Sequence, residues 1–168
     1  RMLLAFTEGV SAESLIAYPE RELSDPDRAS AAIHRRAAGE PVSRIVGRRG
    51  FWKDDFLIGP DTLDPRPDTE TLIEEVLDLL PDRPRVARIL DLGVGSGCLL
   101  LSLLREFPTA SGVGVDISDG AVKATLSNAR EMGLEDRVEV AVGNWFEGLA
   151  DRFDLIVSNP PYIRTGEI

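Results

Sequence analysis

The sequence predicts an α/β fold, a doubly wound parallel sheet that follows a small helical domain and a hairpin. Two observations lead to this prediction. Uninterrupted apolar runs such as Leu155-Ile156-Val157 alternate with amphipathic helical segments from residue 69 onward. Such runs are typical of parallel strands that are buried on both faces and joined by right-handed helical crossovers. A chain of 168 residues can bury a core of this kind without disulfides or a structural metal.

Residues 1–39 predict a helical domain. Ser11 is expected to cap a short helix, and Asp25-Pro26 places a capping side chain before a proline at the first helical position. Gly39 is expected to end that helix. The chain does not begin with methionine, and we expect this domain to be truncated at its start.

Residues 40–68 predict a linker. Ile45-Val46 is interpreted as a short β-type run, and Phe51-Trp52 with Phe56-Leu57-Ile58 predicts a hairpin. The proline-rich stretch that follows is expected to form an ordered loop without helix up to residue 68.

Residues 69–168 predict the sheet domain. Four strands are expected, at 88–92, 112–117, 138–142 and 153–158. Helices are expected at 72–80, 98–107 and 118–132, the last one capped by Ser118. The chain stops soon after the fourth strand, so we expect this domain to be truncated as well.

Composition excludes several functions. A single cysteine, Cys98, leaves no internal disulfide, and a single histidine, His34, leaves no multi-histidine site, so no metal site is predicted. The net charge is −10, with 11 basic and 22 acidic residues in 51–168 against 8 and 7 in 1–50. This balance argues against binding to a nucleic-acid backbone. Without a signal peptide or a membrane-length apolar run, a cytoplasmic protein is expected.

A glycine-rich turn provides the first candidate site. Gly93, Gly95 and Gly97 follow a predicted strand and begin a helix, where a ligand can contact the backbone. Asp116 ends the next strand, where a carboxylate can accept both hydroxyls of a ribose. The two features together favour a nucleoside site, although NAD(H) stays open from these residues alone.

Asn144 and Trp145 follow the third strand. An adenine ring could lie against Trp145 while Asn144 contacts its edge. An aromatic pair buried in the core, Trp145 with Phe146, is an equally good interpretation of the same residues.

Two successive prolines after a buried strand give the most specific signal. They lack N–H groups, so the strand ladder must stop, and Asn159 is held in extended geometry. A planar NH₂ group could donate one hydrogen to the Asn159 carboxamide oxygen and one to the Pro160 carbonyl, with Tyr162 packed on its flat face. Asn159, Pro160, Pro161 and Tyr162 are therefore predicted to be the catalytic residues.

These motifs together resemble class I S-adenosylmethionine-dependent methyltransferases, which have a Rossmann-like sheet, and among them the HemK/PrmC family. The resemblance covers essentially the whole chain. It rests on these segments: Gly39-Glu40-Pro41-Val42, Gly50-Phe51-Trp52, Pro65-Arg66-Pro67-Asp68-Thr69-Glu70, Asn144-Trp145-Phe146-Glu147 and Ile156 to Ile163. Enzymes of this family methylate the glutamine side chain of the Gly-Gly-Gln motif in peptide chain release factors.

The resemblance implies S-adenosylmethionine as the cofactor and a release factor as the protein partner. From the charge balance we expect no direct nucleic-acid partner, and we also expect a monomer that does not bind a membrane. It also implies that only the first four strands of a larger sheet are present. The cofactor-binding residues implied are Gly93, Val94, Gly95, Ser96, Gly97, Asp116, Asn144, Trp145 and Asn159. Asn144 stands where the family usually has aspartate.

Three other functions stay open at this point. A nitrogen methyltransferase could act on a ribosomal-protein glutamine or a nucleic-acid adenine. A truncated chain could bind the cofactor without catalysis. A NAD-dependent oxidoreductase is disfavoured by the G-x-G-x-G spacing and by the N-P-P-Y turn.

Overall fold

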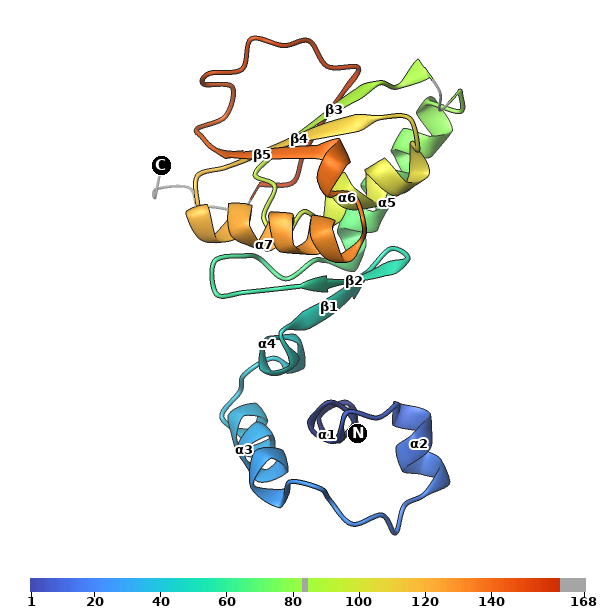
Figure 1. Cartoon of the computed structure of the whole chain (residues 1–168), viewed down its shortest axis with the longest axis vertical. Helices are drawn as coiled ribbons and strands as arrows, with labels where there is room; N and C mark the ends of the chain where they lie inside the picture. The colour runs from blue at the N-terminus through green and yellow to red at the C-terminus, as the bar shows by residue number, and fades with distance from the viewer. Residues whose placement is uncertain (83–84, 161–168) are drawn as a thin grey trace. The chain divides into compact units, whose positions relative to one another are not determined.

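The computed structural model describes residues 1–82 and 85–160 and divides into two units, residues 1–48 and 49–168 (Figure 1). The predicted three-part division with boundaries at residues 39 and 68 stays a prediction. In the part of the chain that the structure describes, no helix has both the length and the apolar character needed to cross a membrane.

The first unit is helical, as predicted. Its helices are α1 (Met2–Glu8), α2 (Ala12–Ala17), α3 (Pro26–Ala37) and α4 (Val42–Val46). The Ser11 hydroxyl accepts a hydrogen bond from the backbone N–H of Ser14 at 3.2 Å, and Asp25 Oδ1 accepts one from Arg28 N–H at 2.9 Å. Both predicted caps are confirmed, because each satisfies a backbone donor that the first turn leaves unpaired.

The β-type run predicted around Ile45 is wrong, because Ile45 lies in α4. Pro41 precedes this helix, and Gly47 ends it with a φ of 73°, in the left-handed region. A proline before and a glycine after five residues favour a single helical turn that is closed at both ends. A short apolar run cannot distinguish this turn from a strand.

The predicted hairpin is confirmed: β1 (Arg48–Phe51), which starts at the last residue of the first unit, pairs with β2 (Asp54–Leu57). Helix α5 (Pro67–Leu79) starts two residues earlier than the predicted boundary. Pro67 occupies its first turn, where the missing N–H group removes no helical hydrogen bond. The expectation that proline excludes helix up to residue 68 is therefore wrong at this one proline.

The main sheet is parallel, with the strand order β5-β4-β3-β6. Its strands are β3 (Arg88–Leu92), β4 (Ser111–Asp116), β5 (Val138–Val142) and β6 (Leu155–Ser158). In this register Leu92 lies beside Val115 on one side and beside Ser158 on the other. The carboxyl ends of these three strands therefore meet at one edge of the sheet.

Helices cover one face of this sheet in the part of the chain that the structure describes. Helix α5, α6 (Cys98–Glu106) and α7 (Asp119–Glu131) lie on the same side (Figure 1), and the short 3₁₀ turn η2 (Glu135–Arg137) precedes β5. Within residues 1–82 and 85–160, no helix covers the opposite face, where burial on both faces predicts one. Leu149 and Phe153, from the loop between β5 and β6, pack there against a cluster that includes Leu90 and Val113.

Candidate active site

The glycine-rich turn joins β3 to α6 and is held against the end of β4. The N–H groups of Gly93 and Val94 donate to the Val115 carbonyl at 2.8 and 3.1 Å. Gly97 precedes α6 with a φ of 79°, and a Cβ at this position would lie 2.7 Å from Thr125 Cγ2. Both the backbone conformation and the close approach of α7 therefore require glycine at position 97.

Two buried polar side chains of α7 form hydrogen bonds with the carbonyl groups of the same turn. Thr125 Oγ1 donates to the Gly95 carbonyl at 3.0 Å, and Asn128 Nδ2 donates to the Ser96 carbonyl at 2.8 Å. Asn128 also bonds both the N–H and the carbonyl of Leu57 in β2. Sequence reasoning missed these two residues, because the inward positions of an amphipathic helix give no sign of which backbone groups they will meet.

Asp116 lies at the end of β4, directly beside the glycine turn. Its Oδ2 accepts a hydrogen bond from Gly95 N–H at 2.9 Å, and its Oδ1 accepts one from Ser118 N–H at 3.0 Å. A carboxylate oxygen has two acceptor sites, so each oxygen retains one for a ligand hydroxyl. Asp116, which the sequence predicts to bind a ribose, therefore lies next to the glycine-rich turn.

Asn144 and Trp145 lie just past the end of β5. The Gly143 N–H donates to the Asp116 carbonyl at 2.9 Å, which places this segment beside the carboxylate. The Trp145 side chain is 54% exposed and its φ is 52°, so the alternative of an aromatic pair buried in the core is wrong. Ile117, which sequence reasoning missed, is 79% exposed next to Asp116 and adds an apolar surface where a flat ring could pack.

One pocket brings the glycine turn and the predicted catalytic residue together. Three parts of the chain line it: residues 63–66 with Thr69, the glycine-turn residues Asp91, 93–96, Cys98 and Leu99, and Asn159. Pro160 lies close by, because a Cβ on Gly93 would be 3.9 Å from Pro160 Cα. Pro161 and Tyr162, the other two predicted catalytic residues, lie outside the described residues.

Asp91 is a pocket residue to which the sequence analysis assigned no role. Its side chain is 1% exposed, and its Oδ1 has no hydrogen-bond partner within the described residues. Burial raises its pKa to about 7, and the nearby negative charge of Asp116 adds to the rise. Its signal is an acidic residue inside a buried strand, two positions before the first glycine, where a core would otherwise be apolar.

Cys98 also lines the pocket, but its thiol is unsuited to nucleophilic chemistry. Burial raises the pKa of this thiol to about 12, and only the thiolate is a strong nucleophile. Among the residues that the structure describes, no cluster of histidine, cysteine, aspartate or glutamate could hold a metal ion. The pocket therefore offers polar groups that bind and orient a ligand.

Comparison with the models of known protein families identifies the family of this chain. The family model described as "Methyltransferase small domain" matches residues 66–168. The chain belongs to the methyltransferase small domain family. A second model, "PrmC N-terminal domain", matches residues 1–47. The predicted HemK/PrmC resemblance and the predicted class I methyltransferase fold are both confirmed.

Curated relatives of this methyltransferase-family chain carry the name release factor glutamine methyltransferase. The protein from Rhodospirillum rubrum is 51% identical, over 100% of this chain and 52% of its own length. Those from Agrobacterium fabrum and Escherichia coli are 47% and 38% identical, over 98% and 96% of this chain and 59% and 58% of their own lengths. The chain thus spans between half and three-fifths of the length of these relatives.

Among solved structures, the catalytic domain of hMettl16, in complex with the MAT2A 3'UTR hairpin 6, has the same fold. Its TM-score is 0.54, with 22% identity, over 66% of this chain and 39% of that one. This similarity supports the α/β architecture of the methyltransferase-family chain and carries no information on its substrate.

Proposed function

We propose that the protein transfers a methyl group from S-adenosylmethionine to the side-chain nitrogen of the glutamine in the Gly-Gly-Gln motif of a release factor. One observation carries the proposal: Asn159 and the glycine turn line the same pocket. Asn159 can bind the planar amide of a substrate, and the glycine turn can hold the nucleoside of a cofactor, so both ligands would meet in this pocket. The curated relatives that carry the name release factor glutamine methyltransferase support this substrate.

The described residues fit the cofactor. Asp91 offers a buried carboxylate oxygen, without a partner among the described residues, to the ammonium group of the methionine part, which is the kind of partner that a buried charge needs. Asp116 retains acceptor sites for the ribose hydroxyls, and the exposed apolar side chains of Ile117 and Trp145 can flank the adenine. S-adenosylmethionine supplies, when bound, a methyl group activated by a positively charged sulfur.

The chain's own residues have to orient a poor nucleophile. The lone pair of an amide nitrogen is delocalised, as the barrier of about 18–20 kcal/mol to amide rotation indicates. The Asn159 carboxamide oxygen and the Pro160 carbonyl can each accept one N–H of the substrate amide. Two fixed acceptors direct the nitrogen and favour the positive charge that develops on it during the reaction. No basic side chain is needed, because the N-methylated cation is acidic enough to lose its proton to water.

Replacing Asn159 with alanine tests this mechanism. We expect Asn159→Ala in the full-length protein to lower methyl transfer by at least about 100-fold, the effect of removing one oriented polar group from a transition state. The assay measures transfer of a labelled methyl group to a purified release factor, and a release factor with Gln→Ala in its Gly-Gly-Gln motif serves as the substrate control.

The matched protein control is Asp78→Ala, on the exposed side of α5, which should keep the wild-type rate. Thermal unfolding checks that both variants are folded. Near-normal turnover by Asn159→Ala would contradict the mechanism. Equal labelling of the Gln→Ala release factor would contradict the substrate, and transfer to a ribosomal protein or to adenine would replace it. Sedimentation of the full-length protein checks the predicted monomer.

A further inference from the structure

We infer that Thr69 is a positioning residue that fixes which end of the Asn159 carboxamide faces the pocket. The inference rests on the proposed function, in which the oxygen of that carboxamide has to accept a hydrogen from the substrate amide. Asn159 Nδ2 donates to Thr69 Oγ1 at 2.7 Å, across 90 positions of the sequence.

Both partners lie at the ends of hydrogen-bonded secondary structure. Thr69 is 7% exposed in the first turn of α5, and its N–H donates to the Arg66 carbonyl at 2.9 Å. Asn159 follows β6, where the Ser158 hydroxyl donates to the Leu92 carbonyl of β3 at 2.7 Å. Neither side chain can therefore follow a movement of the other without disturbing a helix start or a strand pair.

The contact with Thr69 determines which way the carboxamide oxygen of Asn159 faces. A carboxamide carries its NH₂ donor and its oxygen acceptor on opposite branches of one carbon atom. When the NH₂ group donates to Thr69, the oxygen is directed away from Thr69 and is free to accept from a ligand. The reverse orientation would present an NH₂ group to the NH₂ group of the substrate, and two donors repel each other.

Conservative substitutions separate this role from simple packing. Thr69→Val keeps the shape of the side chain and removes the hydroxyl, whereas Thr69→Ser keeps the hydroxyl and removes a methyl group. Thr71→Val is the matched control on the same turn of α5, because Thr71 is exposed and its hydroxyl donates to the Asp68 carbonyl, outside the pocket.

In the full-length protein, we expect Thr69→Val to lower kcat on a release factor by about 10- to 100-fold, as for a small misplacement of a reacting group. KM for the release factor and the calorimetric affinity for S-adenosylmethionine should change by less than about threefold, since uniform binding is untouched. Thr69→Ser should recover kcat to within about threefold of the wild type, and Thr71→Val should match it.

A second measurement does not depend on activity. The side-chain NH₂ resonances of Asn159, observed by NMR after selective asparagine labelling, should shift in Thr69→Val and stay near their wild-type positions in Thr69→Ser. Wild-type kcat in Thr69→Val, equal losses in the valine and serine variants, or unchanged Asn159 resonances would overturn the inference. An inactive wild-type protein would instead overturn the proposed function.

Discussion

The buried carboxylate of Asp91 lowers the stability of the fold, although the proposed function uses the same group to bind the cofactor. The carboxyl group of Asp91 is buried, its Oδ1 has no hydrogen-bond partner among the described residues, and burial raises its pKa to about 7. In an unfolded chain the same group releases its proton near its ordinary pKa of 3.8. The folded state therefore binds the proton more tightly, so stability falls as the pH rises from about 4 to about 7.

The variant Asp91→Asn should show both effects. At pH 8 we expect its free energy of unfolding to exceed that of the wild type by on the order of 4 kcal/mol, and at pH 5 the difference should shrink. Its affinity for S-adenosylmethionine should fall, because the ammonium group loses its counter-charge. Urea unfolding at the two pH values and calorimetry measure these effects.

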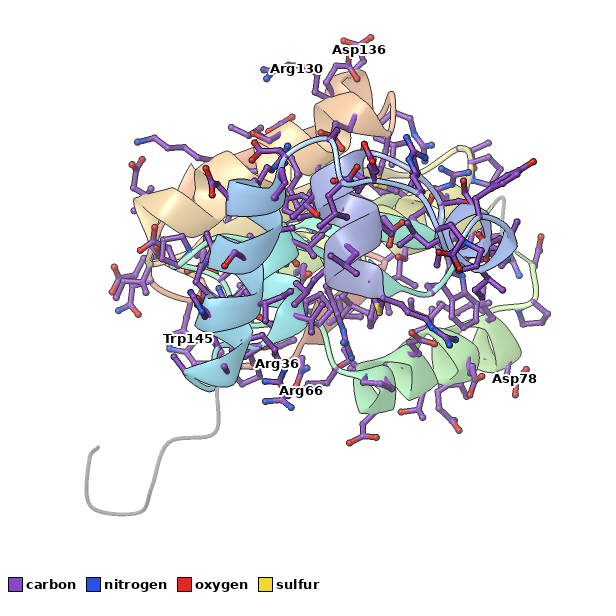
Figure 2. All side chains as sticks on the ribbon, turned by 90° about the horizontal axis from the view of Figure 1, so that it is seen from below. Arg36, Arg66, Asp78, Arg130, Asp136 and Trp145 are labelled. Carbon is purple, nitrogen blue, oxygen red and sulfur yellow. The ribbon has the colours of Figure 1, made fainter. Side chains whose placement is uncertain are left out.

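The control for this prediction is Asp78→Asn, whose carboxylate projects into solvent from α5 (Figure 2). This variant should have the wild-type pH dependence of unfolding. If Asp91→Asn gave the same stability difference at pH 5 and pH 8, the carboxyl group would not titrate as burial requires.

At the scale of elements, one arginine links the end of α6 to the turn that follows α7. Arg137, just after α7, donates from its guanidinium to the carbonyls of Leu104, Phe107 and Ala110 at 2.7 to 2.9 Å. These carbonyls lie at and after the end of α6, where a helix leaves its last acceptors unpaired. One arginine therefore joins the end of α6 to the turn before β5.

We expect Arg137→Met to lower the free energy of unfolding by about 2 to 3 kcal/mol, because it leaves several carbonyls without a charged donor. Arg130→Met serves as the control. Arg130 lies in the last turn of α7 and extends into solvent (Figure 2), and its replacement should change stability by less than about 0.5 kcal/mol. Equal urea midpoints for the two variants would contradict the role given to Arg137.

The elements also show what sequence patterns can and cannot predict. Caps at Ser11, Asp25 and Ser118 were predictable because each depends on neighbours within three residues. The strands were predictable from apolar runs. The residues that hold the site in place could not be predicted. Thr125, Asn128 and Thr69 form hydrogen bonds with groups that lie 30 to 90 positions away in the sequence. Nothing local in the sequence marks such partners.

For the whole molecule, the uneven charge has a consequence for ligand binding. Residues 51–168, which include the proposed cofactor-binding residues, hold twice as many acidic as basic side chains. S-adenosylmethionine carries a positive sulfur, whereas the demethylated product S-adenosylhomocysteine does not. The acidic surroundings should therefore favour the charged cofactor over the product, and salt should reduce this preference.

We expect a rise from about 50 to about 500 mM NaCl to weaken S-adenosylmethionine binding by about threefold, since exposed charges beyond a short screening length cease to contribute. Binding of S-adenosylhomocysteine should change little. Calorimetry with both ligands in the two buffers gives the ratio of affinities. A ratio that does not depend on salt would show that the net charge of this half has no effect on ligand choice.

The half-buried Cys98 makes this chain convenient for site-specific spectroscopy. It is the single cysteine among the 168 residues, and burial raises the pKa of its thiol to about 12, so little thiolate is present near neutral pH, where maleimide dyes react. A cysteine introduced on an exposed helix position, such as Asp78→Cys, would therefore take up one fluorophore while the natural thiol stays unmodified. Time-resolved fluorescence could then follow ligand entry in a protein that keeps its native pocket.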